Sequence, residues 1–341
     1  MMEALRTVFT YQLVHAAIRC SIPLMYACMA CIICRQANVF NMSVEGVMLF
    51  SCFIAAAVSY KTSNWVIAVL VSIIFGMLVS GFLALSSMKL KGNIVIMAIA
   101  INMFALAFTR FAMQQVFHTN GSFTSKLMQG IPTVTHGLFE GNAVLTSLFD
   151  GYNLFEVVAP FFVVALWFAL YKTTWGLRLR TVGLNDMCAK TAGVMPDKYK
   201  VQALLISGAI AGLAGAHMSL GYVTLYSDNM VGGRGFIGMA AMYFGNANPL
   251  LAALACLLFG TFDALAARVQ LIGIPSQFVN MLPYLITVLI LAIAMASLAR
   301  TERKQRSAKQ YVVTDKRPSQ ITKRSVIYGN HVSNHRTGSF A

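Results

Sequence analysis

Long apolar stretches, separated by short polar ones, follow one another along most of this chain. A helix needs roughly 20 apolar residues to cross a hydrocarbon core of about 30 Å. The stretches are much longer than barrel strands and lack a period of two, so they predict helices. The pattern therefore predicts an all-α polytopic membrane protein with about 9–10 transmembrane helices, some short or re-entrant. The nine apolar stretches lie at about 14–34, 41–60, 64–87, 92–112, 153–171, 201–221, 232–246, 249–268 and 277–298, and an amphipathic segment at 3–13 is the tenth candidate.

Two of the nine stretches begin with residues that are unusual in a lipid-facing helix. One opens with the polar and flexible run from Asn41 to Gly46, and the other opens with the glycine-rich run from Gly232 to Gly235. Such segments persist at membrane depth only where protein surrounds them or where they line a watery cavity. Both are therefore expected to face inward, towards a translocation pathway.

The composition excludes a soluble domain, because 58% of the residues are hydrophobic and only 11% are charged. The net charge of +15 is unevenly distributed. If the nine stretches cross alternately, 19 of the 26 Lys and Arg residues lie on one side and 5 on the other. The positive-inside rule places the richer side in the cytoplasm. Topology thus accounts for the basic bias, and we expect no nucleic-acid partner.

This assignment divides the chain into two regions. Residues 1–299 form the predicted transmembrane domain, with an external loop at 113–152 and a cytoplasmic loop at 172–200. Residues 300–341 form a basic cytoplasmic tail whose composition is typical of disorder or of contact with anionic lipid.

Motifs of enzymes and metal sites are not prominent. Cys28, Cys31 and Cys34 have a spacing that suggests iron–sulfur or zinc on a soluble loop, but inside an apolar helix it favours side-chain packing. His217 is interpreted as a helix–helix hydrogen-bonding residue rather than a ligand. The chain has no Gly-x4-Gly-Lys loop, so we predict no catalytic residue, no metal and no ATP hydrolysis by this chain. A stripe of small residues predicts close helix packing: Ser207, Gly208, Gly212 and Gly215.

Polar and ionisable residues inside the apolar stretches are the candidates for the pathway, because they are costly in a bilayer. Glu45 has two open interpretations: it braces a short helix through Arg35 or Arg234, or it takes part directly in the pathway. Asp263 and Arg268 are close enough in sequence to approach each other near a helix end. The pathway candidates are Asn41, Glu45, Gly46, Asn102, Arg234, Asp263 and Gln277.

The basic loop at 172–200 contains signals for a short helix. Asn185 and Asp186 form a start signal, and Gly193 with Pro196 forms a stop. Such a short helix is marginal in water, so it is expected to pack against a partner. The alternative is an ordinary basic loop.

Several of these stretches together resemble one family. They are Asn41–Leu49, Trp175–Asn185 with Ala189–Val194, Ile206–Ala216, Gly233–Met242, Leu258–Leu265, and Ile274–Gln277 with Met281–Tyr284. Over residues 15–298 the chain resembles the membrane permease subunits of ATP-binding-cassette (ABC) importers, in the branch for nucleosides, simple sugars and branched-chain amino acids. It looks most like the nucleoside permeases.

The resemblance implies a mechanism and a set of partners. The helix at about 185–193 would be the coupling helix that docks on a cytoplasmic ATPase, which binds ATP–Mg, while this chain binds no cofactor. A second permease chain, homologous but different, would complete the pathway, and an extracytoplasmic solute-binding protein would deliver the solute. The coupling residues would be Arg178, Arg180, Gly183, Asn185, Ala189, Thr191 and Gly193.

The expected function is therefore ATPase-driven alternating access for a neutral solute, most of all a nucleoside, in a bacterial plasma (inner) membrane. The protein would be multi-pass with a cytoplasmic C-terminus. A simple-sugar permease of the ribose or galactose type is the nearest alternative. An ion-coupled secondary transporter, which would work without an ATPase, is a further one.

Overall fold

The structure is a computed structural model that describes residues 11–119, 121–135 and 151–270. All structural statements below concern these residues. They all belong to one compact unit. The predicted stretch at 277–298, the pathway candidate Gln277 and the basic tail at 300–341 lie outside the described residues.

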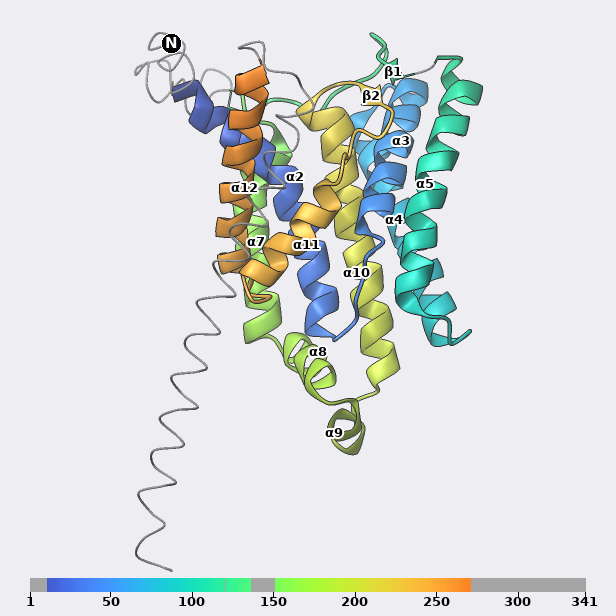
Figure 1. Cartoon of the computed structure of the whole chain (residues 1–341), viewed down its shortest axis with the longest axis vertical. Coiled ribbons are helices and arrows are strands. Elements are labelled where there is room, and N and C mark those ends of the chain that lie inside the picture. The colour runs from blue at the N-terminus through green and yellow to red at the C-terminus, as the bar shows by residue number, and fades with distance from the viewer. Residues whose placement is uncertain (1–10, 120, 136–150, 271–341) are drawn as a thin grey trace, which may run out of the picture. The chain divides into compact units, whose positions relative to one another are not determined.

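The described chain is almost entirely helical (Figure 1). Seven of its helices are long and apolar enough to cross a membrane, which confirms the all-α polytopic class. The eleven residues of α11 span only about 16 Å, so this helix is short, as predicted. The helices are α2 (Tyr11–Gln36), α3 (Val44–Thr62), α4 (Trp65–Met88), α5 (Ile94–Phe117), α7 (Leu154–Lys172), α8 (Thr174–Leu184), α9 (Asp186–Thr191), α10 (Pro196–Ala216) continued by the π-helical turn η1 (His217–Tyr222), α11 (Arg234–Phe244) and α12 (Pro249–Gln270).

An asparagine residue caps the start of three membrane-spanning helices, α4, α5 and α7. Asn64 accepts a hydrogen bond from the backbone N–H of the second residue of α4, and Asn93 does the same for α5. At α7 the backbone N–H of Asn153 donates to Glu156, three residues later. Each cap satisfies backbone groups that the helix itself leaves open, so these boundaries follow from local sequence.

The helices divide into a central and a peripheral group. The most apolar, membrane-length part of α2 is 83% buried inside the protein, whereas the corresponding part of α5 is 22% buried. With α2, the helices α3 and α10 form the centre, and α4, α5, α7 and α12 expose apolar side chains. Exposed apolar side chains on membrane-spanning helices suit contact with lipid, which is as apolar as they are.

The predicted small-residue stripe of α10 packs closely against α3 and α4, as expected. A Cβ atom at Gly212 would lie 2.6 Å from the carbonyl oxygen of Ser72 on α4, so only glycine fits there. Gly208 lies against Gly76 in the same interface, and Gly215 lies against the backbone of α3. The backbones therefore approach as closely as small-residue motifs in membranes allow.

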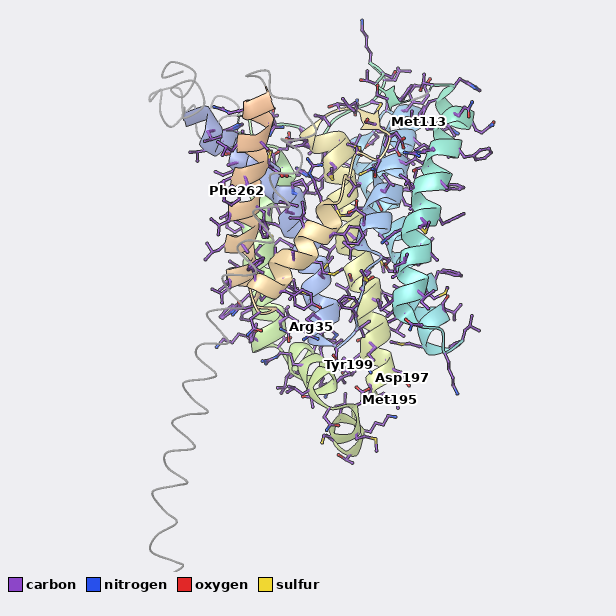
Figure 2. All side chains as sticks on the ribbon, in the orientation of Figure 1. Arg35, Met113, Met195, Asp197, Tyr199 and Phe262 are labelled. Atoms are coloured by element: carbon purple, nitrogen blue, oxygen red, sulfur yellow. The ribbon has the colours of Figure 1, made fainter. Side chains whose placement is uncertain are left out.

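Polar segments gather at the two ends of the helices. At one end, β1 (Ser122–Phe123) pairs antiparallel with β2 (Tyr226–Ser227), and Ser122 faces Ser227. At the other end lie α8, α9 and the turn between α4 and α5 (Figure 1). Figure 2 places Arg35, Met195 and Tyr199 towards this second end and Met113 towards the first. The described segments that the charge pattern assigned to the cytoplasmic side thus lie together at this second end of the protein.

Candidate functional site

Two helices of the described chain begin inside the helix bundle. Residues 37–43 have no regular helix before α3 starts at Val44, and a non-helical segment also precedes α11. Figure 1 shows that both starts lie partway along the long helices. These are the two stretches whose opening residues predicted an inward-facing position, and the structure brings them together although they are 190 residues apart.

The contact between the two starts is made by the carboxylate of Glu45. One oxygen accepts a hydrogen bond from the backbone N–H of Gly233 and the other accepts one from Gly235, both at 2.7 Å. A Cβ atom at Gly235 would lie 2.7 Å from the same carboxylate, so the approach requires glycine. The negative carboxylate thereby sits at the positive end of the α11 dipole and satisfies two of its open amides.

Glu45 is thus a brace, but neither arginine expected as its partner plays that role. The guanidinium of Arg234 instead donates to the carbonyls of Met230 and Val231, in the turn before α11. Arg35 lies near the far end of α2, over the ring of Tyr243. Backbone amides replace the predicted ion pair because the glycine-rich start of α11 offers unpaired N–H groups at close range.

Asn102 on α5 holds the start of α3 in the same manner. Its side-chain oxygen accepts from the backbone N–H of Gly46 at 2.8 Å, and its amide nitrogen donates to the carbonyl of Met42 at 2.9 Å. Asn41 closes the preceding turn: its oxygen accepts from the backbone and hydroxyl of Ser43, and its nitrogen donates to Ser207. The polar candidates near the helix starts are therefore hydrogen-bonded within the protein.

One further pathway candidate, Asp263, comes from a different helix. Asp263 on α12 interacts electrostatically with Arg234, so one arginine acts on both Asp263 and Glu45. The structure thus gathers Asn41, Glu45, Gly46, Asn102 and Arg234 around the two helix starts and adds Asp263 from α12.

A second intramembrane polar network escaped the sequence reasoning. The guanidinium of Arg19 on α2 donates to Glu156 of α7 at 3.2 Å, and His217 of η1 lies 3.6 Å from the same carboxylate oxygen. The side chains of Glu156 and His217 are fully buried. The Asn-x-x-Glu pattern of the α7 start was the available signal for Glu156. His217 thus contacts α7, but the hydrogen bond expected of it is not formed, because neither of its ring nitrogens has a hydrogen-bond partner in the described chain.

The predicted short helix in the basic loop is confirmed as α9. The side chain of Asn185 accepts from the backbone N–H groups of Met187 and Cys188, which starts the helix, and Gly193 ends it with a φ of +78°. The preceding α8 was not predicted. Together α8 and α9 form a helical hairpin outside the membrane-spanning helices, and an ion pair between Asp186 and Lys200 ties it to α10.

Several predicted coupling residues shape this hairpin. Ala189 is fully buried, Thr191 bonds to the backbone of α9, and Gly183 lies so close to the carbonyl of Gln36 that a side chain would overlap it. Arg178 is exposed and donates to the hydroxyl of Tyr199, whereas Arg180 turns back over the ring of Tyr171. The sequence reasoning missed three exposed apolar side chains: Leu184, Met187 and Met195 at 88%, 72% and 71% exposure.

The cysteines and acidic residues do not converge on a metal site in the described ranges. Cys28, Cys31 and Cys34 are all buried within α2. Within residues 11–119, 121–135 and 151–270, no three His, Cys, Asp or Glu side chains are grouped to hold a metal ion.

Comparison with known proteins places these features in a family. The family model described as the permease component of the branched-chain amino acid transport system matches residues 13–291. The nucleoside ABC transporter permease protein NupC of Lactococcus lactis subsp. cremoris is 30% identical over 80% of this chain and 89% of its own length. The guanosine ABC transporter permease protein NupQ of Bacillus subtilis is 27% identical over 82% and 89%.

A third relative has a different substrate in its name. TsgC13, a permease protein of Haloferax volcanii with a provisional glucose assignment, is 29% identical over 84% of this chain and 92% of its own length. No solved structure matches the chain significantly. The family match covers all the described helices except the first two residues of α2, including the starts of α3 and α11 and the hairpin. The chain therefore belongs to the family of permease components of branched-chain amino acid transport systems, and is a multi-pass membrane subunit of an ABC importer rather than an enzyme.

Proposed function

We propose that this chain forms half of the translocation pathway of an ABC importer for nucleosides. The α8–α9 hairpin is the observation that carries the transport mechanism, because the hairpin and the turn that follows it expose Leu184, Met187 and Met195 at the end of the protein where the basic segments gather. Exposed apolar side chains outside the membrane are typical of a protein–protein interface. The partner in this proposal is a cytoplasmic ATPase, which binds and hydrolyses ATP–Mg.

The coupling part of the proposal is tested with two substitutions in the hairpin, Leu184→Glu and Met187→Glu. Burying one such side chain contributes roughly 1.5–3 kcal/mol, so each variant should weaken ATPase association by about tenfold or more. Leu90→Glu is the matched control, because Leu90 is 74% exposed in the turn between α4 and α5, away from the hairpin. Copurification with the ATPase is the readout. Equal retention of the ATPase by all three variants would contradict docking through the hairpin.

The nucleoside assignment is supported by two relatives, the nucleoside permease NupC and the guanosine permease NupQ. An uncharged solute also suits the two helix starts, because the ionisable groups there are engaged with one another: Glu45 accepts from backbone amides, and Arg234 acts on both Glu45 and Asp263. Uptake of labelled uridine or guanosine is expected to be competed by unlabelled nucleosides and not by ribose or glucose. Competition by sugars alone would favour a sugar permease, the candidate supported by the Haloferax relative.

The assembly follows from the same proposal. One chain offers one coupling hairpin, so a second permease chain, homologous but different, completes the pathway. A solute-binding protein delivers the nucleoside from outside, and the chain's own C-terminus lies in the cytoplasm. The protein resides in a bacterial plasma membrane. Uptake that continued in vesicles without ATP, driven only by an ion gradient, would instead indicate a secondary transporter.

A further inference from the structure

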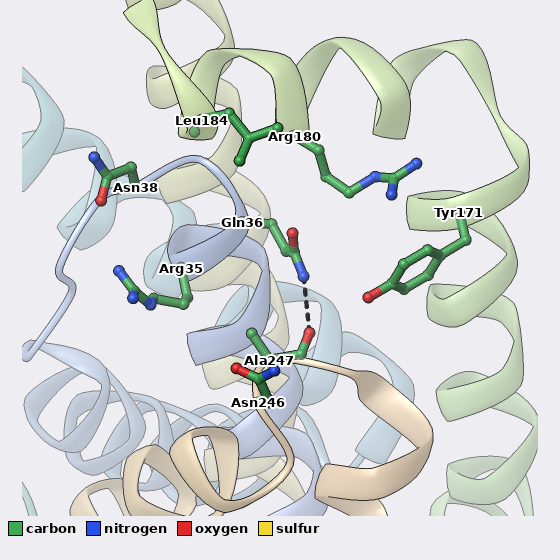
Figure 3. Close-up of a pocket in the computed structure, with 9 residues that line it drawn as sticks. Arg35, Gln36, Asn38, Tyr171, Arg180, Leu184, Asn246 and Ala247 are labelled. Carbon is green, nitrogen blue, oxygen red and sulfur yellow. Dashed lines mark hydrogen bonds between the residues drawn. The ribbon is translucent and has the colours of Figure 1, made fainter. Parts of the chain in front are cut away.

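A polar pocket of about 450 Å³ lies where the hairpin meets the ends of the membrane helices (Figure 3). Its walls come from the end of α2, the end of α7, the α8 helix and the turn between α11 and α12. This volume is within the range of about 300–1,000 Å³ that is typical of small-molecule sites. The pocket is separate from the Glu45 region, and it borders the exposed hairpin surface at Leu184, which belongs to both. Its lining residues are Arg35, Gln36, Asn38, Tyr171, Arg180, Gly183, Leu184, Asn246 and Ala247.

The charge of this pocket is uncompensated. Two arginines, Arg35 and Arg180, line it, and no Asp or Glu does. Neither guanidinium forms a salt bridge within the described part of the chain. Figure 3 shows the two head groups on opposite sides of Gln36. A wall with two cations and no anion selects for negative charge and excludes metal ions.

The arginines are held in place by aromatic rings rather than by carboxylates. The guanidinium carbon of Arg180 lies 4.6 Å from the ring centroid of Tyr171, and that of Arg35 lies 5.9 Å from the ring centroid of Tyr243. The Nε atom of Arg180 is buried without a hydrogen-bond acceptor. A cation on a ring face keeps its edge N–H groups available, and these match the oxygens of phosphate.

The pocket wall contains three residues with a left-handed backbone, and the strain falls on Ala247. Asn38, Asn246 and Ala247 all have left-handed φ angles, of 55°, 48° and 55°. Asparagine tolerates this region, but alanine seldom adopts it. The side chain of Gln36 donates to the carbonyl of Ala247 at 2.8 Å and so holds the strained turn against α2. Strain of this kind collects at ligand sites, where the surrounding structure maintains it.

We propose that this pocket binds a phosphate-bearing small molecule, with Arg35 and Arg180 as the anion-recognising residues. The inference does not depend on the identity of the transported solute. Because the walls belong to α2, α8 and the α11–α12 turn, a bound anion links the hairpin to the helix that carries the Glu45 contact. The site is thus positioned to influence how the hairpin moves relative to the membrane helices.

The direct test is a binding titration with the full chain in neutral phosphatidylcholine nanodiscs. The probes are inorganic phosphate and adenosine monophosphate, with adenosine as the uncharged control. Both anions are expected to bind and adenosine to bind at least tenfold more weakly. Arg180→Gln and Arg35→Gln should each weaken anion binding by about tenfold or more, since a charge-assisted contact is lost. The matched control is Lys172→Gln, which removes an exposed cation beside Tyr171 but outside the pocket.

The remaining arms identify the source of the phosphate and guard against misfolding. In nanodiscs that contain phosphatidylglycerol, the lipid headgroup could occupy the same site and prevent the soluble anions from binding to wild type. The occupant is then identified as the lipid if wild type also shows a directly measured preference for phosphatidylglycerol and Arg180→Gln loses that preference. Arg180→Lys keeps the charge and should retain more affinity than Arg180→Gln, which separates recognition from a folding defect. Absence of binding to wild type in both membranes, or equal affinity of the glutamine variants and wild type, would overturn the proposal. If an added ATPase prevents phosphate binding and its removal restores it, the anion site is confirmed and lies within the surface that the ATPase covers.

Discussion

The hydrogen bonds between Glu45 and the start of α11 allow a quantitative prediction for Glu45→Gln. Glutamine has nearly the same shape but only one acceptor oxygen, so one of the two backbone N–H groups would face an NH2 group instead. The wild-type bonds, both at 2.7 Å, are short and charge-assisted. Losing one costs roughly 1.5–3 kcal/mol, and the lost dipole interaction adds about 0.3–1 kcal/mol.

This loss of about 2–4 kcal/mol should appear as local opening of α11. At about 1.4 kcal/mol per factor of ten, the amides near residues 230–236 should exchange with deuterium about 30- to several-hundred-fold faster. Hydrogen–deuterium exchange of the protein in nanodiscs measures this directly. Asp263→Asn is the matched control, because Asp263 is also an acidic residue inside the membrane that interacts with Arg234, but it makes no hydrogen bond to α11 in the described chain. Its exchange over the same residues should resemble that of wild type.

An unchanged exchange rate in Glu45→Gln would refute the brace. The same two variants test the pathway role, which is a separate question. Both neutral substitutions are expected to lower solute uptake more than they lower membrane insertion. Normal uptake by both variants would remove Glu45 and Asp263 from the pathway, while leaving the brace intact.

Three further predictions concern helix packing and the polar contacts inside the membrane. Gly212→Val should lower the free energy of unfolding by roughly 1–3 kcal/mol, because the new side chain would overlap α4. Gly81→Ala should cost less, because the nearest neighbour of Gly81 is the flexible tip of a leucine side chain. Equal losses of the two variants in size-exclusion melting curves would contradict this packing. Arg19→Gln should destabilise by about 3 kcal/mol by stranding the buried carboxylate of Glu156, and adding Glu156→Gln should recover part of the loss; strictly additive effects in a double-mutant cycle would mean no coupling. Asn102→Ala should leave two backbone groups at the α3 start unpaired, at about 1–3 kcal/mol each, and show faster deuterium exchange there; unchanged exchange would argue against the clamp.

Local features of the sequence predicted the helices of the periphery well. An apolar run of membrane length is favourable in lipid whatever its neighbours are, so α4, α5, α7 and α12 begin and end within a few residues of the predicted stretches. The start of α9 was predictable for a similar reason, because Asn185 caps amides only two and three residues away. The stripe of glycines on α10 also indicated close packing without naming the partner helix.

The α8 helix shows where local reasoning stops. Its residues are of mixed polarity and form no membrane-length run, yet Leu179 and Val182 are buried, and Gly176 lies against the end of α7. The helix therefore depends on contacts with the rest of the fold. Contact with the end of α7 likewise turns Arg180 towards Tyr171 and away from the exposed tip, where a coupling residue was expected.

The sequence by itself thus determined the protein class, the helices that cross the membrane and the segments that gather at each end, because these depend on the length and charge of contiguous residues. Only the tertiary structure decided which polar groups inside the membrane meet. The carboxylate of Glu45 can be satisfied by an arginine or by free amides, and the sequence allows either. Folding brings the start of α11, nearly 190 residues away, within hydrogen-bonding distance, and its glycines leave room for the carboxylate but not for another side chain.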